Sequence, residues 1–190
     1  MRPALIVVDL LRDTFENHPD SAIVRDAKAF IPILNRLIDA FHAAGLPVIF
    51  ACDSFLEGDF IFQGRMQPHS LRGTPGASVI SELHRDMDDH ILIKRRFSAF
   101  FKTDLDQTLR MHGVDAVFVT GIATHVCVLT TALDAVSNDF RAVIVEDCCA
   151  AHRPEENRAV LEAYRKTPLY PLLRVAGSKE CLEMLDEREC

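Results

Sequence analysis

Three residues with reactive side chains, Asp9, Lys94 and Cys127, each follow a short apolar run in which a strand is expected. At the end of a buried strand the Asp9 carboxylate would be desolvated, which raises its pKa and suits it to accept a proton. Cys127 falls in the first turn of an expected helix if Thr124 caps that helix, and unpaired amides there favour a thiolate. A lysine that ends a buried strand needs a partner. These residue types are compatible with a cysteine nucleophile and a neighbouring base.

Each of the three residues also has a purely structural interpretation. A cysteine after a strand is often a small buried residue. A redox thiol would need a resolving cysteine, and none lies near Cys127 in the sequence. Asp9 can instead cap the next helix or accept a backbone amide. Lys94 can face solvent, although Arg95 and Arg96 already supply surface charge there. The residue types alone leave these alternatives open.

The elements that would position these residues alternate between strands and helices. Apolar runs predict strands at 4–8, 46–52, 91–93, 115–121, 141–147 and 171–175. Helical spacing of apolar residues predicts helices at 26–45, 103–113, 125–139, 154–166 and 178–187, with Thr103 capping the second of them. The strands are continuous apolar runs, as parallel strands are when both sheet faces are covered. We therefore expect one domain over residues 1–190, a three-layer, doubly wound, Rossmann-like α/β fold with a mostly parallel sheet of about six strands.

In such a sheet, ligands bind beyond the carboxyl ends of the strands, where the strand order reverses. The first and fourth strands are neighbours in the commonest order, so Asp9 and Cys127 are expected to face each other. Residues 54–89 contain several glycines and prolines and form a long irregular loop. Loops of this length in a compact domain are usually functional.

Charge and composition exclude several classes of protein. The formal net charge is −7, so we expect no nucleic-acid partner. The apolar run 4–8 is too short to span a membrane and has no cleavage site after it, and we expect a cytoplasmic protein. No GxGxxG motif follows the first strand, which argues against a dinucleotide-binding oxidoreductase. The chain has six cysteines without a regular framework, which we interpret as free thiols: Cys52, Cys127, Cys148, Cys149, Cys181 and Cys190.

Four segments occur in this order along the chain: VVD, RGTPGA, KRRFSAF and GIATHVCV. With them the sequence resembles the isochorismatase-like cysteine hydrolase superfamily, over about residues 4–175. This superfamily includes nicotinamidases, N-carbamoylsarcosine amidohydrolases and ureidoacrylate amidohydrolases. The resemblance implies an Asp-Lys-Cys catalytic triad at Asp9, Lys94 and Cys127. It also implies a cis peptide between Ile122 and Ala123, with the amides of Ala123 and Cys127 aimed at the oxyanion. The residues that it places around the substrate are Phe15, Phe97, Thr124 and His125.

The sequence departs from the nicotinamidase pattern in two places. Leu11 and Thr14 replace a glutamine and a phenylalanine of the usual motif after the first strand. Nicotinamidases also bind a metal through an Asp-x-His motif and two further histidines. Here Asp53 is kept, Phe55 stands where the first histidine would be, and only His69 matches among the later ligands. Two matched ligands are too few, so we predict no metal and no other cofactor.

The expected activity is hydrolysis of a C–N bond in a small linear amide or ureido compound, through a thioester and with release of ammonia. Three alternatives remain: a metal-dependent nicotinamidase, an isochorismatase-type vinyl ether hydrolase, and a non-catalytic family member that acts as a binding or scaffold protein. By analogy with relatives we expect a homo-oligomer, either a dimer or a tetramer.

Overall fold

A computed structural model of the protein describes residues 1–187 and contains a six-stranded sheet in the order β3-β2-β1-β4-β5-β6. All neighbouring strands are parallel. The order reverses between β1 and β4, as the doubly wound fold requires. The strands are β1 (Pro3–Val8), β2 (Val48–Asp53), β3 (His90–Lys94), β4 (Ala116–Ile122), β5 (Arg141–Ala150) and β6 (Leu173–Ala176).

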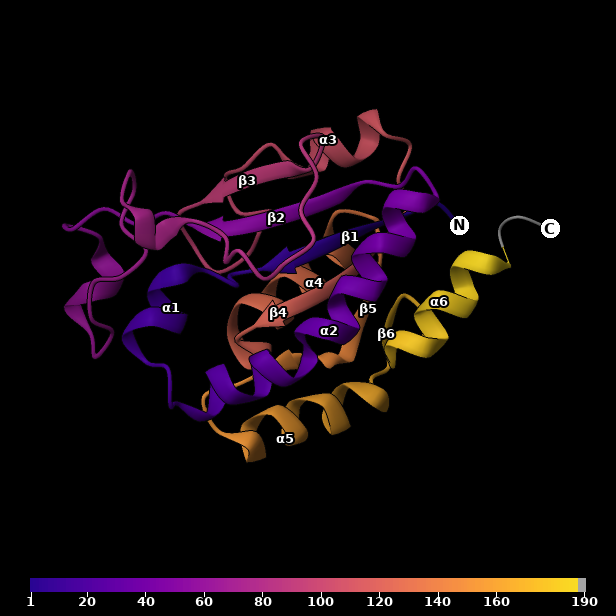
Figure 1. Cartoon of the computed structure of the whole chain (residues 1–190). Helices are drawn as coiled ribbons and strands as arrows, with labels where there is room; N and C mark the ends of the chain where they lie inside the picture. The colour runs from indigo at the N-terminus through magenta and orange to yellow at the C-terminus, as the bar shows by residue number, and fades with distance from the viewer. Residues whose placement is uncertain (188–190) are drawn as a thin grey trace.

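Helices cover both faces of the sheet (Figure 1). One face packs against α1, α2 and α6, and the other packs against α3, α4 and α5. The predicted three-layer architecture is therefore confirmed. The helices are α1 (Arg12–Asn17), α2 (Ala22–Ala43), α3 (Leu105–Met111), α4 (Leu129–Ser137), α5 (Pro154–Arg165) and α6 (Ser178–Asp186).

The inner strands are continuous apolar runs because each of them contributes to two cores. In β1, Leu5 and Val7 belong to the core on the α2 side. Ala4, Ile6 and Val8 belong to the core on the α4 side. Successive side chains of a strand point to opposite faces, so a strand covered on both sides has no polar position. The strand order places the end of β1, and Asp9 after it, at the middle of the carboxyl-terminal edge of the sheet.

Some boundaries differ from the sequence prediction. The short helix α1 was not predicted, because Phe15 is its only buried residue and one buried position shows no periodicity. Helix α2 begins at Ala22 rather than at residue 26. Asp104 rather than Thr103 is the N-cap of α3, although the Thr103 hydroxyl still accepts the amide of Leu105 at 3.3 Å.

All described cysteines are buried and form no disulfide: Cys52, Cys127, Cys148, Cys149 and Cys181. Cys190 lies outside the described residues. Within residues 1–187, no helix combines the length and the apolar character needed to cross a bilayer.

Strands β1 and β4 approach each other closely at Gly121, which pairs with Val8. Gly121 has φ +106°, and a Cβ there would lie 2.1 Å from the Val8 carbonyl oxygen. Gly121→Ala is therefore expected to reduce the free energy of unfolding by about 3 kcal/mol or more, since the substitution adds both a backbone clash and a strained φ. Urea unfolding measures the effect.

The matched control is Gly58→Ala, because a Cβ on Gly58 would meet nothing within 4 Å. That change is expected to stay within about 0.5 kcal/mol of the wild type. Equal stability of the two variants would contradict the close approach of β1 and β4 at Gly121.

Candidate active site

Asp9 lies directly after β1, and its backbone is held against the neighbouring strand. Its amide donates to the carbonyl of Ala51 at 3.0 Å, and its φ is +53°. A left-handed φ in a residue other than glycine costs about 1–3 kcal/mol and is concentrated at functional sites. The N-cap of α1 is Leu11, so Asp9 does not cap that helix. Its Oδ1 instead accepts the amide of Asp53 at 2.8 Å.

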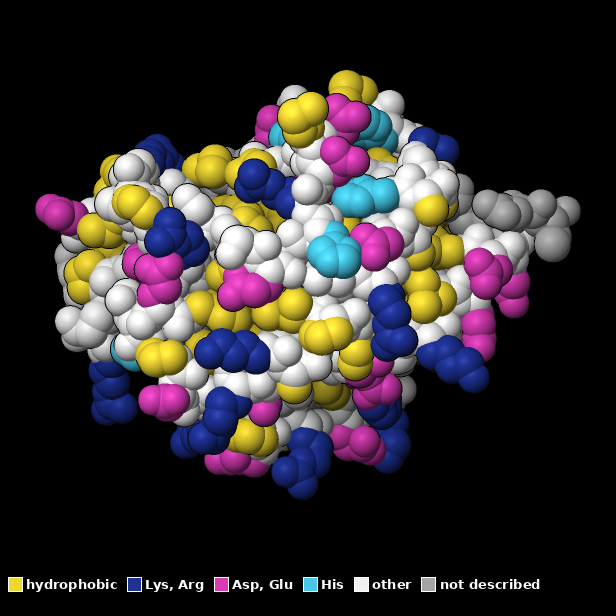
Figure 2. Space-filling model, viewed as in Figure 1, with side chains coloured by type: hydrophobic (Ala, Val, Ile, Leu, Met, Phe, Trp, Pro, Cys, Tyr) yellow, Lys and Arg dark blue, Asp and Glu magenta, His cyan; other side chains and the backbone are white. Residues whose placement is uncertain are grey.

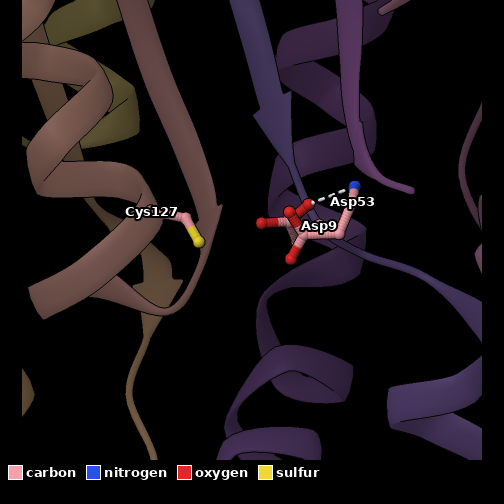
Figure 3. Close-up of side chains that lie close together, drawn as sticks. All are labelled: Asp9, Asp53 and Cys127. Carbon is pink, nitrogen blue, oxygen red and sulfur yellow. Dashed lines mark hydrogen bonds between the residues drawn. The ribbon is translucent and has the colours of Figure 1, made fainter. Parts of the chain in front are cut away.

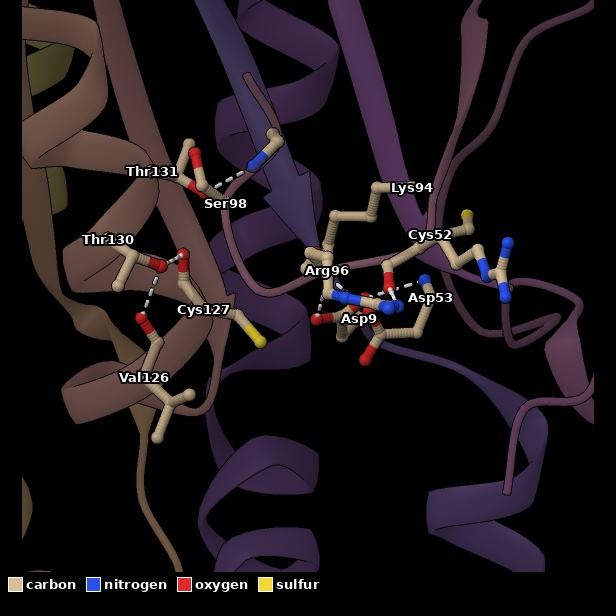
Figure 4. Close-up of polar contacts among 12 residues, drawn as sticks. Asp9, Cys52, Asp53, Lys94, Arg96, Ser98, Val126, Cys127, Thr130 and Thr131 are labelled. Carbon is tan, nitrogen blue, oxygen red and sulfur yellow. Dashed lines mark hydrogen bonds and ion pairs between the residues drawn. The ribbon is translucent and has the colours of Figure 1, made fainter. Parts of the chain in front are cut away.

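Lys94 is completely buried, with 0% of its surface exposed. Its Nζ donates to Oδ2 of Asp9 at 2.8 Å and to Oδ1 of Asp53, so one ammonium joins the ends of three neighbouring strands (Figure 4). Burial by itself lowers the pKa of Lys94, but the neighbouring acidic groups, Asp9 foremost, outweigh it and raise the pKa above its ordinary value. The structure therefore excludes the solvent-facing interpretation of Lys94.

Asp53 is the second carboxylate on this ammonium. Burial and then the charge of Asp9 raise the pKa of Asp53 from 3.8 to about 7, against the opposing effect of Lys94. Two carboxylates that share one cation in a dry environment cannot both ionise at low cost. A proton is therefore held in this group more tightly than by an ordinary aspartate.

Cys127 lies in a π-helical turn, Thr124–Val128, between β4 and α4. Its sulfur, one carboxylate oxygen of Asp9 and one of Asp53 all lie within 4.8 Å of one another, and Figure 3 shows the thiol pointing toward the two carboxylates. The facing arrangement of Asp9 and Cys127 across the β1–β4 switch point is thus as the sequence predicted.

Burial of Cys127 opposes the effect of the helix-terminal amides, which favour a thiolate. Burial raises the pKa of the Cys127 thiol well above its usual 9.0, and Lys94 offsets this only in part. The side chain is only 7% exposed, so desolvation outweighs the helix-terminal effect. The thiol is therefore protonated near neutral pH, and it needs a base before it can attack a carbonyl group.

A cavity of about 530 Å³ opens above these groups, a size suited to a small molecule. Asp9, Asp53 and Cys127 all line it, and residues 65–70 form one of its walls. The rest of its lining consists of Leu11, Asp13, Thr14, Asn17, His18, Ile23, Phe97, Ile122, Ala123, Val126 and His152.

Of the four residues that the sequence placed around the substrate, Phe97 lines this cavity. Ile122 and Ala123, which were expected at the oxyanion, line it as well, and the peptide bond between them is cis.

The other three predicted substrate residues, Phe15, Thr124 and His125, are not among the lining residues. Phe15 is 8% exposed and packs into the core on the α2 side. Thr124 is fully buried, lies inside the helical turn rather than capping it, and donates its hydroxyl to Oδ1 of Asn157 at 2.6 Å. His125 points toward α5, where its Nε2 lies 3.7 Å from the Glu156 carboxylate.

Sequence reasoning considered His69 only as a metal ligand and did not predict that residues 65–70 form a wall of the cavity. It also missed His18 and His152. The length of loop 54–89 marked this region as functional, but an irregular loop has no periodicity from which to read side-chain directions. The wall is fixed by a long-range contact, in which the Ser70 amide donates to Asp13 at 2.6 Å. No local sequence pattern reveals that contact.

The predicted remnant of a metal site does not fit a bound ion. Asp53 is engaged by the ammonium of Lys94, and Nδ1 of His69 lies 2.9 Å from a backbone carbonyl. Among the described residues, the group of possible ligand atoms that lie close together is Asp9, Asp53 and Cys127. Lys94 already supplies a positive charge to its two carboxylates, so a divalent cation at this place would have to compete with a buried ammonium.

Residues 3–173 match the family model described as the Isochorismatase domain. The chain therefore belongs to the isochorismatase family of hydrolases. Among curated proteins it is 30% identical over 166 residues to a probable inactive nicotinamidase of Arabidopsis thaliana, covering 82% of this chain and 84% of the relative.

Solved structures show the same fold. N-carbamoylsarcosine amidase of Thermoplasma acidophilum is 31% identical, with a TM-score of 0.80 over 94% of this chain and 97% of the other. The zinc-bound pyrazinamidase of Pyrococcus horikoshii is 28% identical, with a TM-score of 0.80 over 93% of this chain and 99% of the other.

Proposed function

We propose that this hydrolase is a cysteine-dependent amidohydrolase that cleaves a C–N bond of a small amide or ureido compound and releases ammonia through a thioester intermediate. The observation that carries the proposal is the Cys127 thiol beside the Asp9–Lys94 ion pair at the base of a cavity of about 530 Å³. The likeness to an N-carbamoylsarcosine amidase supports the ureido class.

In the first half-reaction, Asp9 takes the proton of the Cys127 thiol as the sulfur attacks the carbonyl carbon. A base is needed because burial keeps the thiol protonated. The tetrahedral intermediate collapses when the protonated Asp9 returns its proton to the leaving nitrogen. Ammonia departs, and the acyl group remains on sulfur as a thioester.

In the second half-reaction, Asp9 takes a proton from water, and the resulting hydroxide attacks the thioester carbon. The C–S bond breaks, the acid product leaves, and the proton on Asp9 returns to sulfur. The amides of Ala123 and Cys127 are assigned to the oxyanion in both halves, and one such donor is typically worth about 3 kcal/mol.

Lys94 remains charged throughout and fixes the orientation of Asp9. Its second bond, to Asp53, holds the ammonium in place while the charge on Asp9 changes. Both bonds are buried, so these interactions are weakly screened by solvent.

The test is ammonia release from nicotinamide, N-carbamoylsarcosine, ureidoacrylate and simple aliphatic amides, with and without a chelator. Turnover of a linear amide or ureido compound is expected, unchanged by the chelator and lost in Cys127→Ala. Trapping the acyl enzyme by acid quench and finding it on Cys127 by mass spectrometry would identify the thioester.

The alternatives give different results. Nicotinamide turnover that the chelator suppresses would identify a metal-dependent nicotinamidase. Turnover that survives in Cys127→Ala would exclude the thioester. If no substrate released ammonia and Cys127 were alkylated slowly at all accessible pH values, the results would favour a non-catalytic protein.

A further inference from the structure

A second cavity, of about 550 Å³, lies between β3 and the loop that precedes it. Residues 72–79 form one side of it, and Ile91 and Ile93 of the edge strand β3 form the other. In Figure 2, hydrophobic and basic side chains lie next to each other at the place where Figure 1 draws β3. Nothing in the proposed mechanism uses this cavity.

The charge of the second cavity is opposite to that of the whole chain. The chain has a formal net charge of −7, yet the charged residues in the lining of this cavity are Arg72 and Arg85, with no aspartate or glutamate among the described residues there. Neither arginine forms an ion pair within residues 1–187. Two guanidinium groups therefore lie at one cavity without a protein counter-charge.

One of the two arginines is held in position by a buried hydroxyl. Nε of Arg72 donates to Oγ of Ser54 at 3.1 Å, and Ser54 is only 3% exposed. That bond uses the Nε–H and leaves the two terminal nitrogens of the guanidinium as donors. A guanidinium held in this way is well suited to a carboxylate.

The floor of the second cavity is apolar and uncharged. Ile91 and Ile93 are 38% and 51% exposed, which is high for isoleucine side chains on a sheet face. Burial raises the pKa of the Cys52 thiol, which also lines the cavity, to about 12. The thiol is therefore neutral near neutral pH and does not repel an anion.

The second cavity and the catalytic cavity share a wall. Pro75 and Ala77 line the second cavity, while Gly76 between them packs against Asp13, which lines the catalytic one. A Cβ on Gly76 would lie 1.9 Å from Oδ1 of Asp13. This part of the RGTPGA segment therefore separates the second cavity from the catalytic cavity.

We propose that the second cavity binds a small carboxylic acid with an apolar body, whose carboxylate is held by Arg72 and Arg85 and whose hydrocarbon part covers Ile91 and Ile93. Charge complementarity selects an anion, and the exposed isoleucines select an apolar body. The site is separate from Cys127 and does not depend on the proposed amidohydrolase activity.

The test is a titration of the full chain with hexanoate, followed by amide chemical shifts in NMR spectra. Hexanol and hexylamine, of the same chain length, are the neutral and cationic comparisons. Saturable shifts are expected in residues 72–79 and 91–93 with hexanoate. Arg72→Gln and Arg85→Gln are each expected to weaken binding about tenfold or more. Arg158→Gln, an exposed arginine on α5, is the matched control and is expected to leave binding unchanged.

Several outcomes would overturn the proposal. Equal binding of hexanol, shifts centred on Cys127 and Phe97, or absence of saturation at tens of millimolar hexanoate would each exclude a carboxylate site here. A chain that is dimeric in solution, becomes monomeric on Ile93→Asp and does not bind hexanoate would show that a second copy covers this surface instead.

Discussion

Asp9→Asn is expected to lower kcat/KM by about 10³-fold or more while the protein stays folded. The substitution keeps the size of the side chain and an oxygen that can accept the Asp53 amide. It removes the group that takes the thiol proton and later returns it to the leaving nitrogen. Steady-state ammonia release, with circular dichroism as the check on folding, measures the effect.

Although Asp9→Asn lowers activity, it is expected to make the Cys127 thiol ionise more readily. The negative charge of Asp9 adds to burial in raising the pKa of Cys127, so removing that charge lowers the thiol pKa. The pH dependence of iodoacetamide alkylation, followed by mass spectrometry of the Cys127 peptide, reports this pKa. A more ionised thiol in an inactive enzyme would separate the role of Asp9 as proton carrier from any role in forming the thiolate.

Two further variants are the controls for Asp9→Asn. Asp53→Asn removes the other carboxylate on Lys94 and is expected to cost less activity, because Asp53 transfers no proton in the mechanism. Asp88→Asn changes an exposed aspartate and is expected to leave activity unchanged. An Asp53→Asn loss as large as that of Asp9→Asn would contradict the assignment of Asp9 as the base.

Lys94→Met is expected to reduce the free energy of unfolding by about 3–5 kcal/mol near neutral pH. Methionine fills much of the same volume, but the carboxylates of Asp9 and Asp53 lose the buried ammonium that neutralises them. Urea unfolding measures the loss. Lys28→Met, at an exposed position of α2, is the control and is expected to stay within about 0.5 kcal/mol.

The loss of unfolding free energy in Lys94→Met is expected to depend on pH. The folded pKa of Asp53, about 7, already exceeds the ordinary 3.8, so the folded state binds the extra proton between these values. The contribution of the Asp53 carboxyl group to the free energy of unfolding is therefore fully present below about pH 4 and is lost as the pH rises through about 7. Removing Lys94 raises the carboxylate pKa values further, so the difference between variant and wild type is expected to grow from about pH 5 to about pH 8.

If Lys94→Met lost the same free energy of unfolding at about pH 5 and about pH 8, that result would contradict an ammonium shared by Asp9 and Asp53. Neutralising both carboxylates in the same chain, by adding Asp9→Asn and Asp53→Asn to Lys94→Met, is expected to restore part of the stability, because the uncompensated charges are then gone.

Much of the fold and the centre of the site could be predicted from the sequence. Apolar runs such as 4–8 located the strands because both faces of the sheet are covered. The parallel topology then brought Asp9 and Cys127 together, since the ends of β1 and β4 are adjacent. The resemblance to the isochorismatase-like superfamily supplied Lys94 as their partner.

The surroundings of the site could not be predicted in the same way. Asp53 was considered only as a metal ligand, and its contact with Lys94 depends on the register between β2 and β3. Phe15 and Thr124 adjoin the site in sequence but turn into the core and toward Asn157. Neighbouring residues on a helix point in different directions, so closeness in sequence to Asp9 or Cys127 did not place a side chain in the cavity.

Because Asp9 and Asp53 share the Lys94 ammonium, the stage of folding at which Cys127 becomes reactive is also determined. Asp9 lies 44 residues from Asp53 and 85 from Lys94 along the chain, so the group assembles only after β1, β2 and β3 have paired over long loops, which is a late and slow kind of contact. Cys127 joins it through β4. In the proposed mechanism, a partly folded chain therefore has an ordinary thiol with no base beside it, and the nucleophile is activated only when the middle of the sheet is complete.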